Sequence, residues 1–261
     1  MRIKVLIIIV TCAALCGAQR QSFVDSLQRN FHVESCCGSS IADCAKQKPH
    51  CTIAPRLITF LTWMDSVGRI TNDRMAEALF DRYQTLTEKT TVSIKTEGWP
   101  TVGDPKSPLI IAMYFSATCP MCKTTYRDLH NAVTNGQLKG KAKLVSKPFS
   151  ASEQNRALMA AHELNRFSDF MHALAQRGGR VDMNMINSIA DNLKVDKRLF
   201  NILIDDPNLT KHIEQSIQEA RDNNVTLVPT LFISGYRYNS FLGINFIIDA
   251  VEFRHENMKK N

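Results

Sequence analysis

The sequence has no run of lysine and arginine interleaved with aromatic residues, and its basic residues are scattered along the chain. Nucleic-acid binding therefore has no support, because it needs a basic patch or stripe. Internal repeats, low-complexity tracts, a phosphate-binding glycine loop and a histidine-rich metal motif are also absent. What remains is an ordinary globular composition, 44% apolar and 22% charged over 261 residues, long enough to bury a full core.

The start of the chain has the pattern of a secretory signal peptide. A short basic stretch, residues 1–4, precedes an apolar stretch, residues 5–14, and small residues at 16–18 offer a cleavage site. The apolar stretch is too short to span a bilayer. Lipoprotein processing at Cys12 or Cys16 is a weaker alternative, because neither follows the usual small residue. We expect an exported protein, periplasmic or extracellular, with membrane anchoring as the alternative. Removing the signal lowers the formal charge from +7 to +5.

Two cysteines, Cys119 and Cys122, stand where a predicted strand meets a predicted helix. Residues 108–115 form a nearly continuous apolar run of strand length, which suits a strand covered on both faces. Beyond Cys122, residues of the helix core recur at steps of three and four until the Asn-Gly pair at 135–136. This spacing places Cys119 at the N-cap and Pro120 at N1, where a missing N–H costs nothing.

The position at a helix start favours redox chemistry for this cysteine pair. A thiolate at Cys119 faces unpaired backbone N–H groups and the positive end of the helix dipole, which make it the attacking sulfur. Cys122 is then placed to resolve a mixed disulfide. A structural disulfide and a zinc half-site are the alternatives, but a zinc ribbon needs a second close pair of ligands, and no second C-x-x-C exists. His130, further along the same helix, is expected to be a surface histidine rather than a base.

Strand, Cys-Pro-x-Cys and helix in this order resemble the thioredoxin superfamily. That fold needs a proline, usually cis, opposite the cysteines and directly before a strand. Val228 and Pro229, followed by an apolar run at 230–234 and by Gly235, supply it. About one hundred residues separate the two motifs, more than a plain thioredoxin uses, and they are predicted to be mostly helical. Such an insertion is similar to the exported DsbA-like branch, and the resemblance covers roughly residues 91–256.

The resemblance implies an α/β fold. We expect a thioredoxin-like fold with a helical insertion, preceded by a small cysteine-rich helical section. The expected divisions are a signal peptide at 1–18, the N-terminal section at 19–90 and the thioredoxin-like domain at 91–257, with the insertion at about 152–223.

The resemblance also implies dithiol–disulfide exchange with cysteine-containing exported proteins, and an unidentified redox partner that resets the dithiol. Val228 and Pro229 would line the peptide-binding edge beside the cysteines, with Pro120 and Met121 in support. Pro229 would also keep a metal from bridging the dithiol. We expect no cofactor, no metal and no nucleic-acid partner.

Two positions depart from the family pattern and leave the direction of exchange open. Met113 stands where family members often bury an acid that handles the proton of the resolving thiol. Met121 replaces the histidine of the best-known oxidase, which indicates a less oxidising disulfide. An exported thiol oxidase is the first hypothesis for the function. A reductase or isomerase is the second, and a non-catalytic thioredoxin-like peptide-binding module the third.

Four further cysteines, Cys36, Cys37, Cys44 and Cys51, fall within sixteen residues. In an exported protein such a cluster predicts two structural disulfides. The pairing stays open, although a bond between the neighbours Cys36 and Cys37 would be strained. A second redox relay or a four-cysteine metal site is the alternative.

The remaining elements follow from periodicity. Residues 54–67 and 73–86 have the pattern of two amphipathic helices. Residues 91–96 alternate like a strand, and residues 142–147 are predicted as a third strand of the sheet. A helix at about 244–255 closes the fold.

Overall fold

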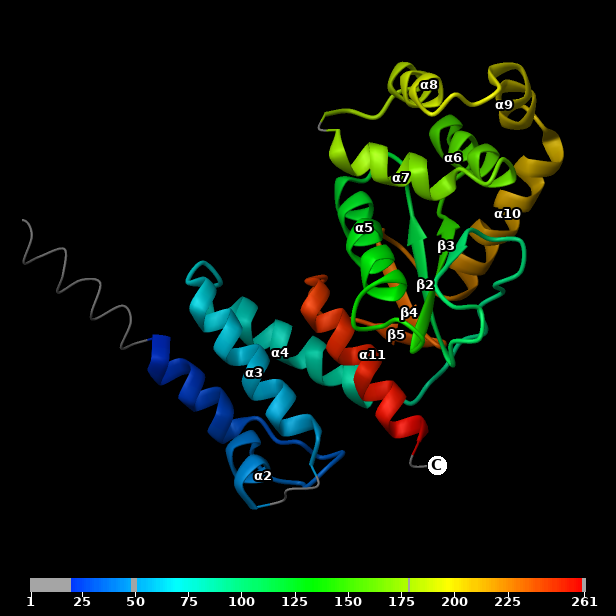
Figure 1. Cartoon of the computed structure of the whole chain (residues 1–261). Helices are drawn as coiled ribbons and strands as arrows, with labels where there is room; N and C mark the ends of the chain where they lie inside the picture. Colours follow the sequence, from blue (N-terminus) through cyan, green and yellow to red (C-terminus); the bar gives the residue numbers. More distant parts are fainter. Residues whose placement is uncertain (1–19, 48–50, 178, 260–261) are drawn as a thin grey trace, which may run out of the picture. The chain divides into compact units, whose positions relative to one another are not determined.

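The computed structural model describes residues 20–47, 51–177 and 179–259, in two compact units (Figure 1). One unit holds the described residues up to Glu88 together with Asn239–Phe241, and the other holds Lys89–Tyr238 and the chain from Leu242 onward. The predicted signal peptide lies outside the described residues. Within those ranges, none of the helices has both the length and the apolar character that crossing a membrane requires.

The N-terminal unit is helical. A first helix, described from residue 20 to 30, is followed by α2 (Ile41–Gln47), α3 (Ile53–Val67) and α4 (Asn72–Thr87). The two amphipathic helices predicted from periodicity are thus confirmed as α3 and α4. Helix α3 ends at Gly68, whose φ of 71° is the left-handed conformation that glycine adopts readily at a helix end. The buried apolar faces of α3 and α4 form the core of this unit, with Leu57, Phe60, Leu61, Met64, Met75 and Leu79 fully buried.

The second unit is built on a five-stranded sheet of order β1-β3-β2-β4-β5. Its strands are β1 (Thr101–Val102), β2 (Leu109–Phe115), β3 (Ala142–Pro148), β4 (Thr230–Ile233) and β5 (Tyr236–Tyr238). Strands β2 and β3 are parallel, whereas β4 runs antiparallel to both β2 and β5. The predicted strands at 108–115 and 142–147 are therefore confirmed, and the first of them is central.

Helices cover both faces of this sheet. Figure 1 shows α5 (Pro120–Thr134) on one side of the strands and α10 (Pro207–Asp222) on the other, with α11 (Ile244–Met258) beside α5. Successive residues of β2 point to opposite faces. Ile111, Met113 and Phe115 join the cluster that contains Cys122, and Ala112 and Tyr114 join the one that contains Ala220 of α10. Burial on both faces explains why β2 is an almost unbroken apolar run.

Between β3 and α10 lie four helices: α6 (Glu153–Glu163), α7 (Phe167–Gln176), α8 (Met183–Asn192) and α9 (Lys197–Ile204). Most of these helices, and α10 after them, begin at a polar side chain that accepts a first-turn backbone N–H. The capping residues are Ser152, Asp182, Asp196 and Asp206. The helical content predicted between the two motifs is present.

The predicted strand at 91–96 does not form. Only Thr91 makes a bridge, to Tyr236, and the Val92 N–H donates to the Gly235 carbonyl at 3.0 Å. Further along, side chains replace a neighbouring strand as partners. The Lys95 N–H donates to the Glu219 carboxylate at 2.9 Å, and Lys147 donates to the Lys95 carbonyl at 2.7 Å. The residues alternate in the sequence as a strand would, but the side chains of Glu219 and Lys147 bind the backbone groups of Lys95 that a neighbouring strand would have paired.

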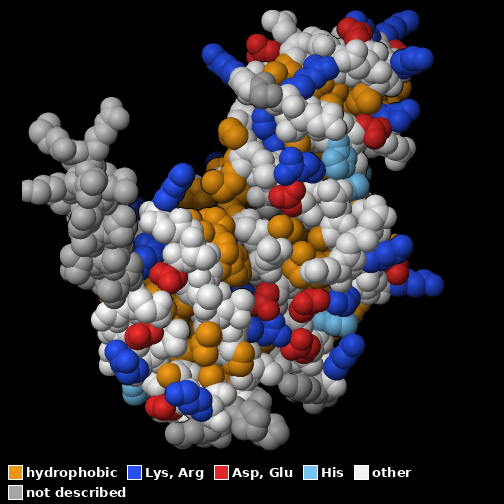
Figure 2. All heavy atoms as spheres, turned by 60° about the vertical axis from the view of Figure 1, so that its left-hand side comes forward, with side chains coloured by type: hydrophobic (Ala, Val, Ile, Leu, Met, Phe, Trp, Pro, Cys, Tyr) orange, Lys and Arg blue, Asp and Glu red, His pale blue; other side chains and the backbone are white. Residues whose placement is uncertain are grey.

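Charged side chains of both signs are interspersed over the face drawn in Figure 2. Lysines and arginines stand next to aspartates and glutamates, and apolar side chains are exposed between them. A single-sign field of the kind that attracts nucleic acid is not visible on that face.

Candidate active site

The first cysteine of the C-x-x-C pair caps the helix that follows it. Strand β2 ends at Phe115, a short loop follows, and α5 begins at Pro120 with Cys119 as its N-cap. The Cys119 sulfur accepts a hydrogen bond from the Cys122 N–H at 3.1 Å. The placement predicted from sequence is thus confirmed, and the sulfur lies where the unpaired N–H groups of a helix stabilise negative charge.

The two sulfurs differ in accessibility. Both cysteines are free thiols, with Cys119 half-buried and Cys122 fully buried at 0% exposure. Burial raises the pKa of the Cys122 thiol well above its ordinary value, and a hydrogen bond with Cys119 raises it further. Cys122 is therefore held as a protonated thiol in the reduced protein, behind a more accessible Cys119.

A segment far along the chain reaches the same place. The Val228-Pro229 peptide bond is cis, as predicted, and it lies directly before β4, which pairs with β2. The Val228 carbonyl oxygen is 3.7 Å from the Cys119 sulfur, so the thiol can donate to it. The sheet thus brings together the two motifs that resembled a thioredoxin, across 109 positions of sequence.

Apolar side chains flank this arrangement and are open to solvent. Met121, between the cysteines, is 54% exposed, and Leu227, directly before Val228, is 63% exposed. Val228 itself is half-buried and packs against the core clusters on both faces of the sheet. An exposed apolar surface next to an accessible sulfur is suited to contact with an unfolded polypeptide.

No carboxylate occupies the position where the family often buries one. Met113 is fully buried in β2 and lies in the same cluster as Cys122. Its register partner on β3 is Ser146, whose buried hydroxyl has no hydrogen-bond partner among the described residues. This pair of positions therefore provides no ionisable group for the proton of Cys122.

Asn155 of α6 supports the site and was missed by sequence reasoning. It is fully buried, and its side-chain oxygen accepts the Ala117 N–H at 2.7 Å, two residues before Cys119. Its side-chain nitrogen donates to the Ser150 carbonyl at 2.8 Å and to the Ser150 hydroxyl at 2.9 Å. The helical insertion is thus fastened to the loop that carries the first cysteine. The sequence showed only a polar residue on the buried face of a helix.

We predict that Asn155→Leu slows thiol exchange by about tenfold to a hundredfold per folded molecule, because Cys119 loses its fixed position. The change also leaves the Ala117 N–H buried without an acceptor, which costs about 1 to 3 kcal/mol of stability. Ser150→Ala is the matched control: it removes one bond to Asn155, keeps the Ala117 bond, and should leave the exchange rate unchanged. Equal rates for Asn155→Leu and the wild type would show that Asn155 only stabilises the fold.

His130 is not the surface histidine that the sequence predicted. It is half-buried, because α7 packs against α5, and its ring lies 4.4 Å from that of His172. Burial, and then the neighbouring His172, lowers the pKa of His130. The ring thus packs between α5 and α7, and among the described residues no contact links it to Cys119.

The four N-terminal cysteines are bonded as Cys36–Cys51 and Cys37–Cys44. The Cα atoms are 5.5 and 5.8 Å apart, within the ordinary range for disulfides. Among the described residues, no group of three or more His, Cys, Asp or Glu side chains could hold a metal ion. The bonds close loops between residues 15 and 7 positions apart.

We predict that removing either N-terminal disulfide lowers stability without stopping exchange at Cys119. Closing loops of these lengths contributes roughly 2 to 3 kcal/mol each in the chain-entropy model. Paired serine variants, Cys36→Ser with Cys51→Ser or Cys37→Ser with Cys44→Ser, should melt at lower temperature and still exchange thiols when folded. A stable variant that has lost exchange would instead indicate a redox relay.

Comparisons with known proteins agree with this fold. The family model described as thioredoxin matches residues 95–250, so the chain belongs to the thioredoxin family. No curated protein matches the sequence.

Solved structures that resemble the chain are DsbA-like thiol–disulfide oxidoreductases and related proteins. A thioredoxin-like oxidoreductase from Silicibacter pomeroyi aligns with a TM-score of 0.55 at 21% identity, over 61% of this chain and 94% of its own. The thiol-disulfide exchange protein alpha-DsbA2 from Wolbachia pipientis aligns with a TM-score of 0.52 at 22% identity, over 67% and 93%. BdbD from Bacillus subtilis gives a TM-score of 0.55 at 16% identity, over 64% and 98%. At these identities the likeness concerns the fold.

Proposed function

We propose that the protein is an exported thiol:disulfide oxidoreductase that oxidises the thiols of other exported proteins through Cys119 and Cys122. One observation carries the proposal. The Cys119 sulfur caps α5, 3.1 Å from the Cys122 N–H, and faces the Val228 carbonyl before the cis proline at 3.7 Å. A sulfur in this position is a good leaving group as a thiolate and is accessible to a second chain.

In the oxidising direction the protein begins with a Cys119–Cys122 disulfide. A substrate thiolate attacks the Cys119 sulfur, the Cys119–Cys122 bond breaks, and Cys122 leaves as a thiolate that takes up a proton. A second substrate thiolate then attacks the substrate sulfur of the mixed disulfide and releases Cys119. The substrate gains a disulfide and loses two electrons, which remain on the reduced pair until a redox partner accepts them.

Substrate contact is assigned to Val228 and Pro229, with Met121 in support. The Val228 carbonyl lies beside the Cys119 sulfur, Pro229 is buried directly after it, and Met121 and Leu227 add exposed apolar area. A polypeptide that exposes apolar side chains near a cysteine is the substrate class that fits.

Oxidation is favoured over reduction by the environment of Cys119. Stabilising the thiolate of the reduced form makes the disulfide a stronger oxidant. Met121 and Met113 supply no charge to strengthen this effect. A reductase or isomerase is the second candidate, and a peptide-binding module that does not need Cys119 is the third.

The expected reduction potential lies between those of thioredoxin and the strongest exported oxidases, within about −120 to −270 mV. It is measured by equilibration with glutathione buffers. The oxidised protein should form disulfides in a reduced, unfolded substrate, and alkylation followed by gel shift should find it oxidised in cells. Ready reduction of insulin, no oxidation of such a substrate and a dithiol in cells would assign the reductase instead.

A further inference from the structure

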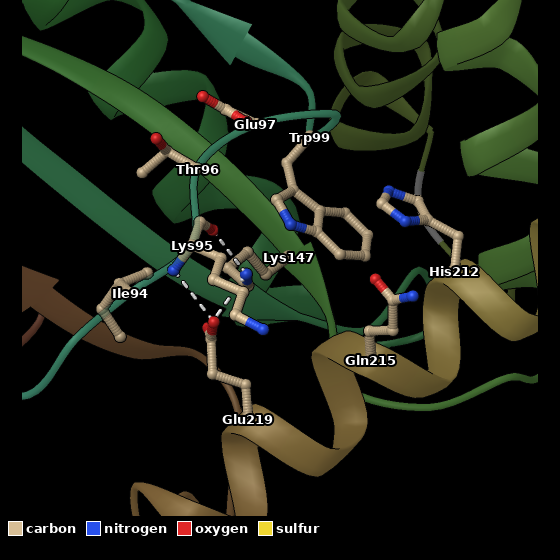
Figure 3. Close-up of a pocket in the computed structure, with 9 residues that line it drawn as sticks. All are labelled: Ile94, Lys95, Thr96, Glu97, Trp99, Lys147, His212, Gln215 and Glu219. Carbon is tan, nitrogen blue, oxygen red and sulfur yellow. Dashed lines mark hydrogen bonds and ion pairs between the residues drawn. The ribbon is translucent and has the colours of Figure 1, made fainter.

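A cavity of about 410 Å³ lies apart from the cysteines, between the segment after Ser93, strand β3 and helix α10 (Figure 3). Its volume is within the range of small-molecule sites. None of its lining residues is a cysteine, and Pro229 does not reach it. One face of α10 contributes His212, Gln215 and Glu219, which point toward the cavity in Figure 3. The thiol chemistry proposed above makes no use of this space.

The inner wall of the cavity is fixed by contacts. Lys147 is 1% exposed and forms an ion pair with Glu219 at 2.9 Å. The Trp99 ring stacks on His212, with centroids 3.9 Å apart and planes within 13°, and the Lys147 nitrogen lies 4.6 Å from the same ring. His212 and Lys147 both contact the Trp99 ring, so the cavity is preorganised rather than formed by a loose loop.

The acceptors of this wall are already in use. One Glu219 oxygen accepts both the Tyr114 hydroxyl and the Lys147 ammonium, and the other accepts the Lys95 N–H. The Lys95 carbonyl accepts from Lys147. A ligand that needs an acceptor from these groups would have to displace a buried ion pair.

Two donors of the wall are not in use. The Trp99 indole N–H has no hydrogen-bond partner within the described part of the chain, although Trp99 is only 5% exposed. The Lys95 ammonium extends toward the cavity in Figure 3, and it makes no ion pair with any described residue. Glu219 balances the charge of Lys147, whereas Lys95 has no counter-ion at ion-pair distance among the described residues; Glu97 also lines the cavity.

We propose that this cavity is a binding site for a carboxylate. The Lys95 ammonium and the Trp99 indole N–H donate to its two oxygens, and the Gln215 amide borders the opening. A singly charged, planar acceptor matches one unpaired cation and one unpaired N–H. A dianionic phosphate would bring a second charge that no group of the wall meets. The carboxylate belongs either to a small free acid or to a polypeptide, as an acidic side chain or a C-terminus.

The test uses the two tryptophan indole N–H signals of the full-length wild-type protein, observed by NMR. The signal that is lost in Trp99→Phe is assigned to Trp99. Acetate and succinate probe the free acid, and an acetylated peptide ending in a free carboxylate is compared with the same peptide ending in an amide. Each titration is matched with chloride at the same ionic strength.

A saturable shift of the Trp99 signal, with the Trp63 signal unmoved, is the expected result. Lys95→Gln should weaken binding by about tenfold or more, because a charge-assisted hydrogen bond is lost. The exposed Lys106→Gln is the matched control and should bind as the wild type does. A response to the free acids or to the carboxylate peptide identifies the source. An equal shift with chloride, unchanged binding by Lys95→Gln, or no saturable shift in the millimolar range overturns the proposal.

Discussion

Cys122→Ser should leave the protein covalently attached to its substrates, whereas Cys119→Ser should form no such complexes. The half-buried Cys119 sulfur can be reached by a second chain, and the fully buried Cys122 sulfur cannot. Without Cys122, nothing inside the protein can release the mixed disulfide. Either change should lower catalytic turnover by on the order of a thousandfold or more, because the two sulfurs act as a unit.

Non-reducing gels of each variant with a reduced, unfolded substrate measure the complexes, and the double serine variant is the blank. Alkylation of the reduced wild type gives an independent check. Burial raises the pKa of Cys122, so at neutral pH the reagent should modify Cys119 first. Equal trapping by the two single variants would reject the roles assigned to them. Full biological activity of Cys119→Ser would instead favour the peptide-binding module.

The parts of the site that sequence predicted correctly are those with local signals. Cys119 and Pro120 mark the N-cap and the first turn of a helix directly after an apolar strand, and those features span only a few residues. The cis proline was found because Val228 and Pro229 stand directly before another apolar strand. Each motif could therefore be recognised from the residues next to it. Pairing of β2 with β4 brings the two motifs together in the sheet.

The parts that sequence missed depend on distant partners. Asn155 acts on Ala117, 38 positions away, and a lone asparagine in a helix gives no sign of this. The false strand at 91–96 has the same cause. The backbone of Lys95 is held by Glu219, 124 positions away, and by Lys147. Periodicity predicts which face of an element is buried, but it does not identify the group that satisfies a backbone N–H.

Glu219→Gln should destabilise the thioredoxin-like unit by about 3 kcal/mol, the usual effect of removing one partner of a buried ion pair. Lys147 is 1% exposed and Glu219 12% exposed at their side chains, 2.9 Å apart. Glutamine has nearly the same shape, but its amide has one accepting oxygen, so it keeps the bond from the Tyr114 hydroxyl or the bond from the Lys95 N–H and not both. The loss therefore combines the missing counter-charge of Lys147 with one missing acceptor.

A matched double change separates charge from packing. Lys147→Met with Glu219→Gln removes both charges and keeps an accepting oxygen for the buried Tyr114 hydroxyl, so it should recover most of the stability lost by Glu219→Gln alone. Unfolding is followed by Trp99 fluorescence in a Trp63→Phe background, because Lys147 lies 4.6 Å from the Trp99 ring. Additive losses from the single changes at the two positions would contradict a coupled pair.

The stability that Glu219→Gln loses relative to the wild type should become smaller as pH rises from 7 toward 10. In the wild type, burial lowers the pKa of Lys147 from its ordinary value of 10.5, and Glu219 opposes this shift. Without Glu219, the pKa of Lys147 falls further. Between that lower pKa and the ordinary one, the unfolded chain holds a proton that the folded chain has released, so the variant gains stability as pH increases. Below the folded-state pKa, both states hold the proton and the full penalty of a buried, uncompensated ammonium applies. Urea unfolding of wild type and variant at a series of pH values measures the difference between their free energies of unfolding. A difference that stays constant up to pH 10 would mean that Lys147 is not the group left unpaired.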